Sequence, residues 1–187
     1  GLSRLGAGFA VARIPEGAKV MANFEPAFQR TLRAEGGFRL TNIKADRGGQ
    51  TYAGIARKMH PRWPGWEWID RDETPPTDLV RDFYRTEFWA PLQCSRMAQE
   101  IAEDIYDFAV NAGPRVSAKL AQAVAGVAPD GAIGPKTIEA LERIDPASFR
   151  PLFALAKIAR YRDIVTRDRT QGRFLLGWLN RVLNDLA

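Results

Sequence analysis

Two carboxylates and a hydroxyl lie close together in the chain, at a spacing that suits acid–base chemistry. Glu35 opens the sequence Glu-Gly-Gly-Phe, and Asp46 and Thr51 follow it in a glycine-rich stretch. Hydrolysis of a glycosidic bond needs one carboxyl group that donates a proton and a second that is ionised. We therefore take Glu35 as the candidate general acid and Asp46 as the candidate stabiliser, base or nucleophile. Thr51 is the candidate for orienting a water molecule.

The segment before Glu35 predicts a helix that gives this carboxyl group an unusual environment. Asn23 suits an N-cap, and Phe24, Phe28 and Leu32 recur at four-residue spacing to form an apolar stripe. Glu35 follows Phe24 by about three helical turns, so we expect it to project from the stripe. The glycines after it are expected to end the helix. Poor solvation and the helix C-terminus would both favour the protonated carboxyl group. The alternative is a glutamate at the rim that turns out to water.

The segment after Glu35 has the composition of a β-hairpin. Asp46 comes shortly before a pair of glycines, and such sequences form hairpin turns. A hairpin would fold Asp46 and Thr51 back over the helix end at Glu35. Taken singly, Asp46 also suits an ordinary turn and Thr51 an ordinary strand. Their order behind an apolar helix favours a catalytic site.

These motifs resemble those of glycoside hydrolase family 108, the N-acetylmuramidases found in phage endolysins. The resemblance runs from about residue 23 to the C-terminus and is carried by Glu35-Gly36-Gly37-Phe38 and by Asp46-x-Gly48-Gly49-x-Thr51-x-x-Gly54-Ile55. It implies that Glu35 is the catalytic acid. Phe38 replaces the family's tyrosine, which keeps the ring and removes a hydroxyl. The order Glu, Asp, Thr also resembles the catalytic triad of phage-type lysozymes, and the roles of Asp46 and Thr51 are carried over from that likeness.

Aromatic side chains near these motifs are candidates for contact with sugar rings. Phe38 and Tyr52 lie within the motifs, and Trp63 and Trp66 lie in the stretch 59–70, where prolines and a glycine predict a loop without regular helix. A tryptophan on a loop can stack on a sugar face or cap the core. We expect at least one tryptophan of this stretch to line the cleft.

Two further motifs lie in the C-terminal half of the chain. The stretch from Asp130 to Thr137, Asp-Gly-Ala-Ile-Gly-Pro-Lys-Thr, resembles the signature of peptidoglycan-binding modules. Asp107 and Asn111 are four residues apart and share a helix face. They are candidates for hydrogen bonds to sugar. The alternative, which we favour, is that they hold the hairpin in place.

Composition restricts the class of protein. The chain has 187 residues, of which 45% are hydrophobic, and no apolar run approaches the roughly 20 residues that span a bilayer. A single cysteine, Cys94, excludes an internal disulfide, and with the lone His60 it gives no metal cluster, so we expect no cofactor. A net charge of +5 suits attraction to an anionic wall or to outer-membrane components.

The sequence predicts a mainly α, lysozyme-like fold with a small β-hairpin near the active site. Residues 1–20 are expected to be a leader or a segment derived from expression cloning, with Met21 as the native start. Residues 21–114 would form the catalytic region. Residues 115–187 would form a helical peptidoglycan-binding-like region packed on it, because no flexible linker separates the two.

Together, the residues and the resemblance indicate a peptidoglycan hydrolase that cleaves the β-1,4 bond between N-acetylmuramic acid and N-acetylglucosamine. We expect a monomeric phage or prophage endolysin that binds peptidoglycan and no nucleic acid. With no clear signal peptide, it would be made in the bacterial cytoplasm and act in the periplasm or wall after holin-type release. The alternatives are a non-catalytic peptidoglycan-binding module, a muramidase that assists secretion, and a basic nucleic-acid-binding protein. The last leaves Glu35 unexplained.

Overall fold

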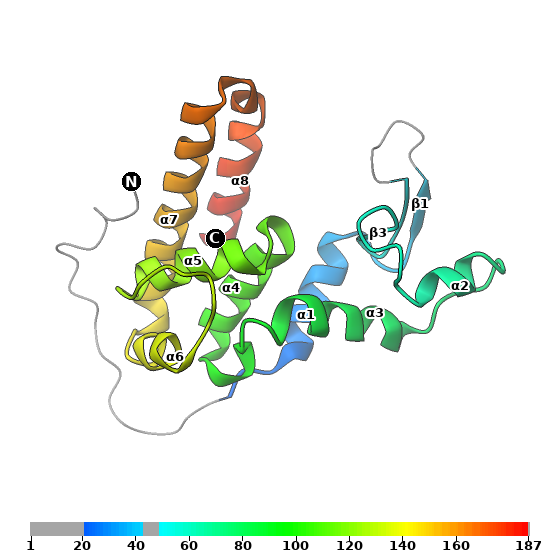
Figure 1. Cartoon of the computed structure of the whole chain (residues 1–187), viewed down its shortest axis with the longest axis horizontal. Helices are drawn as coiled ribbons and strands as arrows, with labels where there is room; N and C mark the ends of the chain where they lie inside the picture. The colour runs from blue at the N-terminus through cyan, green and yellow to red at the C-terminus, as the bar shows by residue number, and fades with distance from the viewer. Residues whose placement is uncertain (1–20, 43–48, 187) are drawn as a thin grey trace. The chain divides into compact units, whose positions relative to one another are not determined.

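The computed structural model describes residues 21–42 and 49–186, and these residues are mainly helical with one small antiparallel sheet (Figure 1). They form two compact units. The first is Asn23–Ala90, and the second runs from Pro91 to residue 186 and includes Met21 and Ala22. The mainly α fold with a small sheet is as the sequence predicted. Within the described residues, no helix combines the length and the apolar composition that crossing a membrane requires.

The first unit contains a helix, a three-stranded sheet and two further helices. Its elements in chain order are α1 (Phe24–Ala34), β1 (Leu40–Asn42), β2 (Gln50–Tyr52), β3 (Ile55–Ala56), α2 (Gly65–Ile69), α3 (Thr77–Tyr84) and the π-helical turn η2 (Arg85–Trp89).

Helix α1 forms as its sequence predicts. The side chain of Asn23 accepts a hydrogen bond from the Glu25 N–H at 3.0 Å, which caps the first turn. Phe24, Phe28 and Leu32 are buried along one face. Phe24 and Phe28 also stack with their ring centroids 5.6 Å apart, which fixes the direction in which this face packs.

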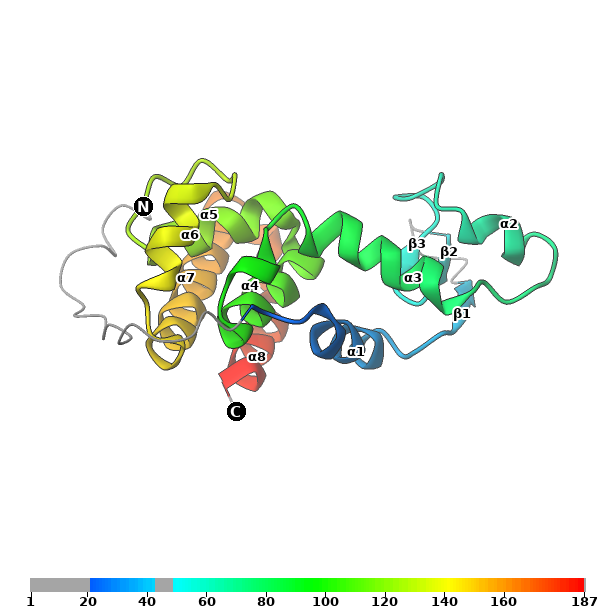
Figure 2. The same ribbon diagram turned by 90° about the horizontal axis from the view of Figure 1, so that it is seen from below.

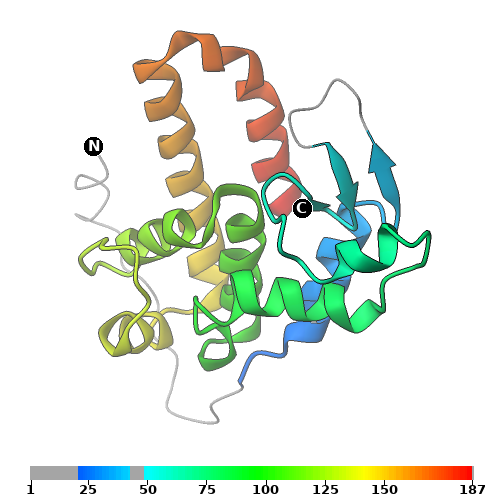
Figure 3. The ribbon, with the colours of Figure 1, turned by 45° about the vertical axis from the view of Figure 1, so that its right-hand side comes forward.

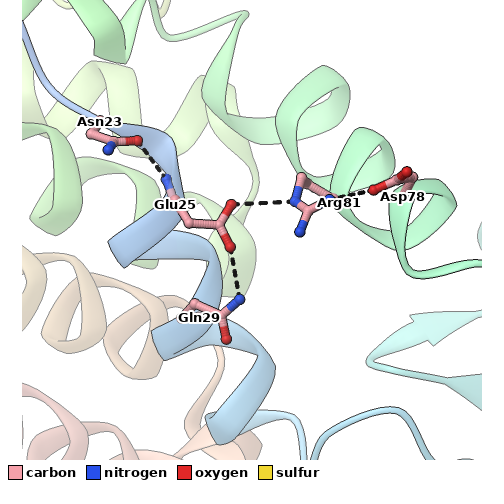
Figure 4. A network of polar contacts seen from close by, with 5 residues as sticks. All are labelled: Asn23, Glu25, Gln29, Asp78 and Arg81. Carbon is pink, nitrogen blue, oxygen red and sulfur yellow. Dashed lines mark hydrogen bonds and ion pairs between the residues drawn. The ribbon is translucent and has the colours of Figure 1, made fainter.

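A polar network joins α1 to α3 (Figure 4). Arg81 on α3 donates to the Glu25 carboxylate at 3.2 Å, and Gln29 donates to the same carboxylate at 2.8 Å. Arg81 also bonds Asp78 on its own helix. Below this network the rings of Phe28 and Tyr84 lie 6.0 Å apart. Helix α3 is therefore held to α1 by both polar and apolar contacts.

The sheet has the order β1-β2-β3 with antiparallel pairing throughout (Figure 3). Thr41 lies opposite Thr51 in the first pair, which confirms the predicted hairpin. In the second pair Tyr52 lies opposite Ile55, so a two-residue turn joins β2 to β3. The small sheet therefore has one strand more than the expected hairpin.

One local prediction for the first unit is corrected. The stretch 59–70, expected to lack regular helix, contains α2, because Pro64 stands at its N-cap, where a missing N–H costs no helical hydrogen bond. Helix α3 begins at Thr77. Pro76 occupies the N-cap position and provides no capping side chain.

The second unit is helical. Its elements are η3 (Cys94–Arg96), α4 (Gln99–Ala112), α5 (Pro114–Val124), α6 (Pro135–Glu142), α7 (Pro146–Arg167), η4 (Arg169–Phe174) and α8 (Leu175–Leu186). Helix α5 packs against α7 (Figure 2). The Ser117 hydroxyl at the start of α5 donates to the Ile105 carbonyl of α4 at 2.6 Å. Because α4 belongs to this packed group, the compact unit begins at Pro91 rather than near residue 115.

Helices α7 and α8 run side by side and are joined by a buried ion pair (Figure 1). The Lys157 ammonium lies 2.7 Å from the Asp185 carboxylate, and its side chain is only 5% exposed. The same ammonium lies 5.5 Å from the ring centroid of Phe108 and 5.2 Å from that of Phe153. Asp185 therefore compensates a charge that the surrounding rings only partly stabilise.

We predict that Asp185→Asn lowers the free energy of unfolding by about 2 kcal/mol, because it leaves the buried ammonium without its carboxylate. The loss is below that of a fully buried pair because Asp185 is 28% exposed. Urea unfolding followed by circular dichroism measures it. Glu139→Gln is the control, since it breaks an ion pair with Arg143 that is exposed on both sides. Equal effects of the two substitutions would contradict the prediction.

Candidate active site

Glu35 lies at the C-cap of α1, and its side chain is exposed. This corrects the expectation that the carboxyl group is buried on the apolar stripe. The stripe is buried as far as Leu32, whereas residues 33–36 are all exposed because α1 runs beyond the part of its surface that the unit covers. The carboxylate is therefore open to solvent and to a ligand.

The two glycines after Glu35 end the helix as predicted. Gly36 and Gly37 have φ angles of +83° and +78°, which side chains rarely allow. The Gly37 N–H bonds the Leu32 carbonyl at 2.8 Å, and the Gly36 N–H bonds the Arg33 carbonyl at 3.2 Å. This pair of hydrogen bonds is a Schellman motif. It fixes the backbone on which the Glu35 side chain stands.

The turn between β2 and β3 lies against the Glu35 side chain. Its two central residues, Ala53 and Gly54, have φ angles of +48° and +81°, as a type I′ turn requires. A Cβ on Gly54 would lie 2.7 Å from Cγ and 2.9 Å from Cδ of Glu35. Real Cβ atoms do not come so close to other heavy atoms, so only glycine allows this approach.

Tyr84 holds the same turn from the other direction. Its hydroxyl donates to the Ala53 carbonyl at 2.9 Å, and its oxygen would lie 2.4 Å from a Cβ on Gly54. The side chains of Glu35 and Tyr84 therefore meet at this glycine. Tyr84 was not among the site residues expected from the sequence. The feature that could have identified Tyr84 is its hydroxyl, because a buried tyrosine hydroxyl needs a hydrogen-bond partner.

The two other predicted catalytic residues are placed differently. Asp46 lies in residues 43–48, outside the described residues. Thr51 is half-buried on β2, and its carbonyl accepts a hydrogen bond from the Thr41 hydroxyl at 3.4 Å. Within the described residues, the turn that reaches Glu35 is the one after Thr51, between β2 and β3. The roles of Asp46 and Thr51 in catalysis stay predictions.

Most of the candidate sugar-binding aromatics belong to the core. Tyr52, Trp63 and Trp66 are 4%, 7% and 3% exposed, and the rings of Tyr52 and Trp63 stack at 6.0 Å. Trp63 and Trp66 also donate their indole N–H groups to backbone carbonyls, those of Leu79 and His60. This corrects the expectation for these rings, because packing on both faces leaves no face for a sugar.

Phe38 and Trp68 of the first unit are at least partly accessible, as are the half-buried Phe83 and Phe88. Phe38, in the Glu-Gly-Gly-Phe motif, is 42% exposed. Trp68 is half-buried, with the Arg71 guanidinium 5.4 Å from its ring centroid. Of the four aromatic residues named as candidates from the sequence, Phe38 alone offers a free face.

Asp107 and Asn111 lie on α4 in the second unit. The Asn111 amide donates to the Asp107 backbone carbonyl at 2.9 Å, one helical turn earlier, and the Asn111 side chain is exposed. The contact is local to the last turn of the helix. Their contact with sugar stays a prediction.

The Asp130–Thr137 motif is built around one buried glutamine. The amide nitrogen of Gln122, which is 1% exposed, donates to the Asp130 carboxylate at 2.8 Å, to the Ala132 carbonyl and to the Thr137 hydroxyl. Its amide oxygen accepts the Gly131 N–H at 2.9 Å. The Ala132 N–H, which donates to the Asp130 carboxylate at 2.9 Å, and the Gln122 amide together lower the pKa of Asp130. The signature residues therefore shape the loop before α6.

No group of three histidine, cysteine, aspartate or glutamate side chains that could hold a metal ion occurs in residues 21–42 and 49–186. Burial raises the pKa of the Cys94 thiol well above its usual range, which suits a packed side chain rather than a reactive one.

Comparison with known proteins agrees with this geometry. Residues 28–113 match the family model described as Glycosyl hydrolase 108, and residues 93–183 match one described as Predicted Peptidoglycan domain. The two matches overlap over residues 93–113, which contain the whole of α4. A solved structure titled "Structure of Brucella abortus SagA" is similar, with a TM-score of 0.68 and 26% identity over 87% of this chain and 90% of that one. The lysozyme-like fold expected from the sequence is thereby confirmed. No curated protein sequence matches the chain.

The close packing at Gly54 predicts a strong effect of one added methyl group. Gly54→Ala should displace the Glu35 and Tyr84 side chains and reduce the protein's activity on peptidoglycan by at least about tenfold, which is the effect of on the order of 1.4 kcal/mol in the barrier. Gly49→Ala is the matched control, because Gly49 also has a positive φ, +66°, but has no atom within 4 Å of its Cβ position. Urea unfolding separates lost stability from lost activity. If Gly54→Ala and Gly49→Ala have the same activity, the contact at Gly54 does not position the Glu35 side chain.

Proposed function

We propose that this chain, which belongs to glycoside hydrolase family 108 and carries a helical peptidoglycan-binding-like region, is an N-acetylmuramidase. It would hydrolyse the β-1,4 bond between N-acetylmuramic acid and N-acetylglucosamine in bacterial peptidoglycan. The family matches support the coarser function of a peptidoglycan hydrolase. The observation that carries the proposal is the position of Glu35, a motif carboxylate that is exposed at a helix end and held against Gly54 and Tyr84.

In this proposal Glu35 donates a proton to the oxygen of the leaving sugar. Exposure gives the carboxyl group access to the glycan, and the Schellman motif fixes the backbone below it. The turn at Gly54 restricts the side chain from one direction, so its carboxyl group is held for transfer instead of sampling many rotamers. Tyr84 acts on the reaction by holding that turn through the Ala53 carbonyl.

Asp46 and Thr51 complete the proposed chemistry. Asp46 would be ionised and act as base for the attacking water, which Thr51 would orient. β2 brings Thr51 to within three residues of the turn that contacts Glu35, and this supports its assignment. Phe38 would offer its exposed ring to the sugar.

The proposed setting is a phage or prophage endolysin that acts on the wall from the periplasmic side. A muramidase that assists secretion would carry out the same reaction, so the proposed reaction does not depend on this biological setting. A peptidoglycan-binding module without catalysis is the rival of a different class. It would bind sacculi but release no reducing sugar, whereas the proposal expects both.

We predict that Glu35→Gln lowers the rate of peptidoglycan hydrolysis by on the order of 10²-fold or more, because the amide keeps the shape and cannot donate the proton. Release of reducing sugar from purified sacculi measures the rate. Glu67→Gln is the control, since Glu67 is an exposed glutamate of the same unit, on α2. Activity of Glu35→Gln within a few-fold of the wild type would refute the assignment.

The second prediction concerns the stereochemistry of the product. If Asp46 activates a water that Thr51 holds, the carboxyl groups must lie far enough apart to admit that water, and the anomeric centre inverts. We therefore expect the α anomer to form first from the β-linked glycan. Proton NMR of the earliest product, recorded before mutarotation, distinguishes the two anomers. A β anomer formed first would show retention and remove the base role of Asp46.

A further inference from the structure

A small groove lies between two packed helices of the second unit, α5 and α7 (Figure 2). Its volume is about 90 Å³. Val116 and Leu120 of α5 and Ile164 of α7 give it an apolar lining. None of these three residues belongs to the Asp130–Thr137 loop, but Lys119, which also lines the groove, lies beside Gly131 of that loop.

The charged residues of the groove are mostly basic. Lys119, Arg160 and Arg167 line it together with one carboxylate, Asp163, so three positive charges against one negative leave a net charge of +2. Asp163 accepts a 2.7 Å hydrogen bond from Arg162, which lowers its pKa and keeps it ionised at neutral pH. Among the described residues, no carboxylate pairs with the three cations. Their charge is therefore available to a ligand.

The size and lining of the groove restrict the ligand. A volume of about 90 Å³ is well below the roughly 300–1,000 Å³ of pockets that enclose a drug-sized ligand, so a small group of a larger ligand suits the groove. The apolar lining favours a methyl-sized group attached to the anion over a bare phosphate, which would lose its hydration without compensation. Guanidinium groups bind carboxylates well because their donors form a planar fork.

We propose that this groove binds a carboxylate of the peptidoglycan peptide stem, with the adjoining small side chain on Val116, Leu120 and Ile164. The peptide stem is the part of the wall that joins free carboxylates to alanine-sized side chains. Asp163 provides an acceptor for an ammonium group of the same ligand. This inference rests on the proposed action on peptidoglycan and assigns the stem peptide, rather than the glycan, to the second unit.

Binding of a glycan-free stem tetrapeptide, measured by calorimetry on the full chain, tests the proposal. Arg160→Gln with Arg167→Gln should weaken binding about tenfold or more, since each lost charge-assisted hydrogen bond contributes strongly. The matched control is Arg169→Gln with Arg181→Gln, which removes the same charge from exposed positions of the same unit outside the groove. This control should change the affinity less than twofold. A tetrapeptide with amidated carboxyl groups should bind the wild type as weakly as the intact peptide binds the groove variant.

A second variant keeps the test decisive if the double substitution disturbs folding. Val116→Phe fills the groove without changing charge and should weaken stem binding to a similar degree, with circular dichroism confirming the fold. The proposal is overturned if the control weakens binding equally, if the amidated peptide binds as well as the intact one, or if Val116→Phe binds normally. Loss of DNA binding in the groove variant, without loss of stem binding, would show a general polyanion surface and overturn it as well.

Failure of this inference is distinguishable from failure of the proposed function. Glu35→Gln should bind the stem peptide with wild-type affinity, because the substitution leaves the groove unchanged. Stem binding by a wild-type protein that releases no reducing sugar would overturn the muramidase proposal alone. Hydrolysis of sacculi without measurable stem binding would overturn the groove assignment alone.

Discussion

The close approach of a helix end to a β-turn is the constraint on which the candidate site depends. Gly54 leaves room for the Glu35 side chain and for the Tyr84 hydroxyl at the position where any other residue would place its Cβ. The turn needs positive φ at two successive residues, and the hydroxyl bonds the carbonyl of the first. The glutamate is thereby positioned by backbone shape and by one buried hydrogen bond. Its own side chain needs no ion pair to hold it, which leaves its carboxyl group available for chemistry.

The two units use charge in different ways. In the first, Arg81 and Glu25 join α1 to α3 near the surface and fix the frame around the site. In the second, Lys157 and Asp185 hold α7 to α8 within the core. The groove cations are the exception, because no ion pair of Lys119, Arg160 or Arg167 with a described carboxylate is formed, although Arg167 helps to lower the pKa of Asp163. A protein that acts on an anionic wall gains from such uncommitted positive charge, since it raises the rate and strength of encounter.

The fold could be predicted from sequence where local rules decide it. Asn23 caps its helix as expected, and the glycines after Glu35 end α1. The site was less predictable because its contacts are tertiary. Helical periodicity placed Glu35 on the buried stripe, but burial depends on what covers the helix end, and that is not a local property. Likewise, tryptophans in a proline-rich stretch suggested a sugar-binding loop, whereas Trp63 and Trp66 find partners for their rings and N–H groups inside the unit.

The central claim is that the chain cleaves peptidoglycan on the reducing side of N-acetylmuramic acid. Its most direct test is mass spectrometry of soluble fragments from purified sacculi, after digestion with the wild-type protein and reduction with borohydride. The account predicts that new reducing ends are N-acetylmuramic acid, recovered as its reduced alcohol. Reducing ends of N-acetylglucosamine would show that the other glycosidic bond is cut. Fragments released without any new reducing sugar would contradict glycoside hydrolysis altogether.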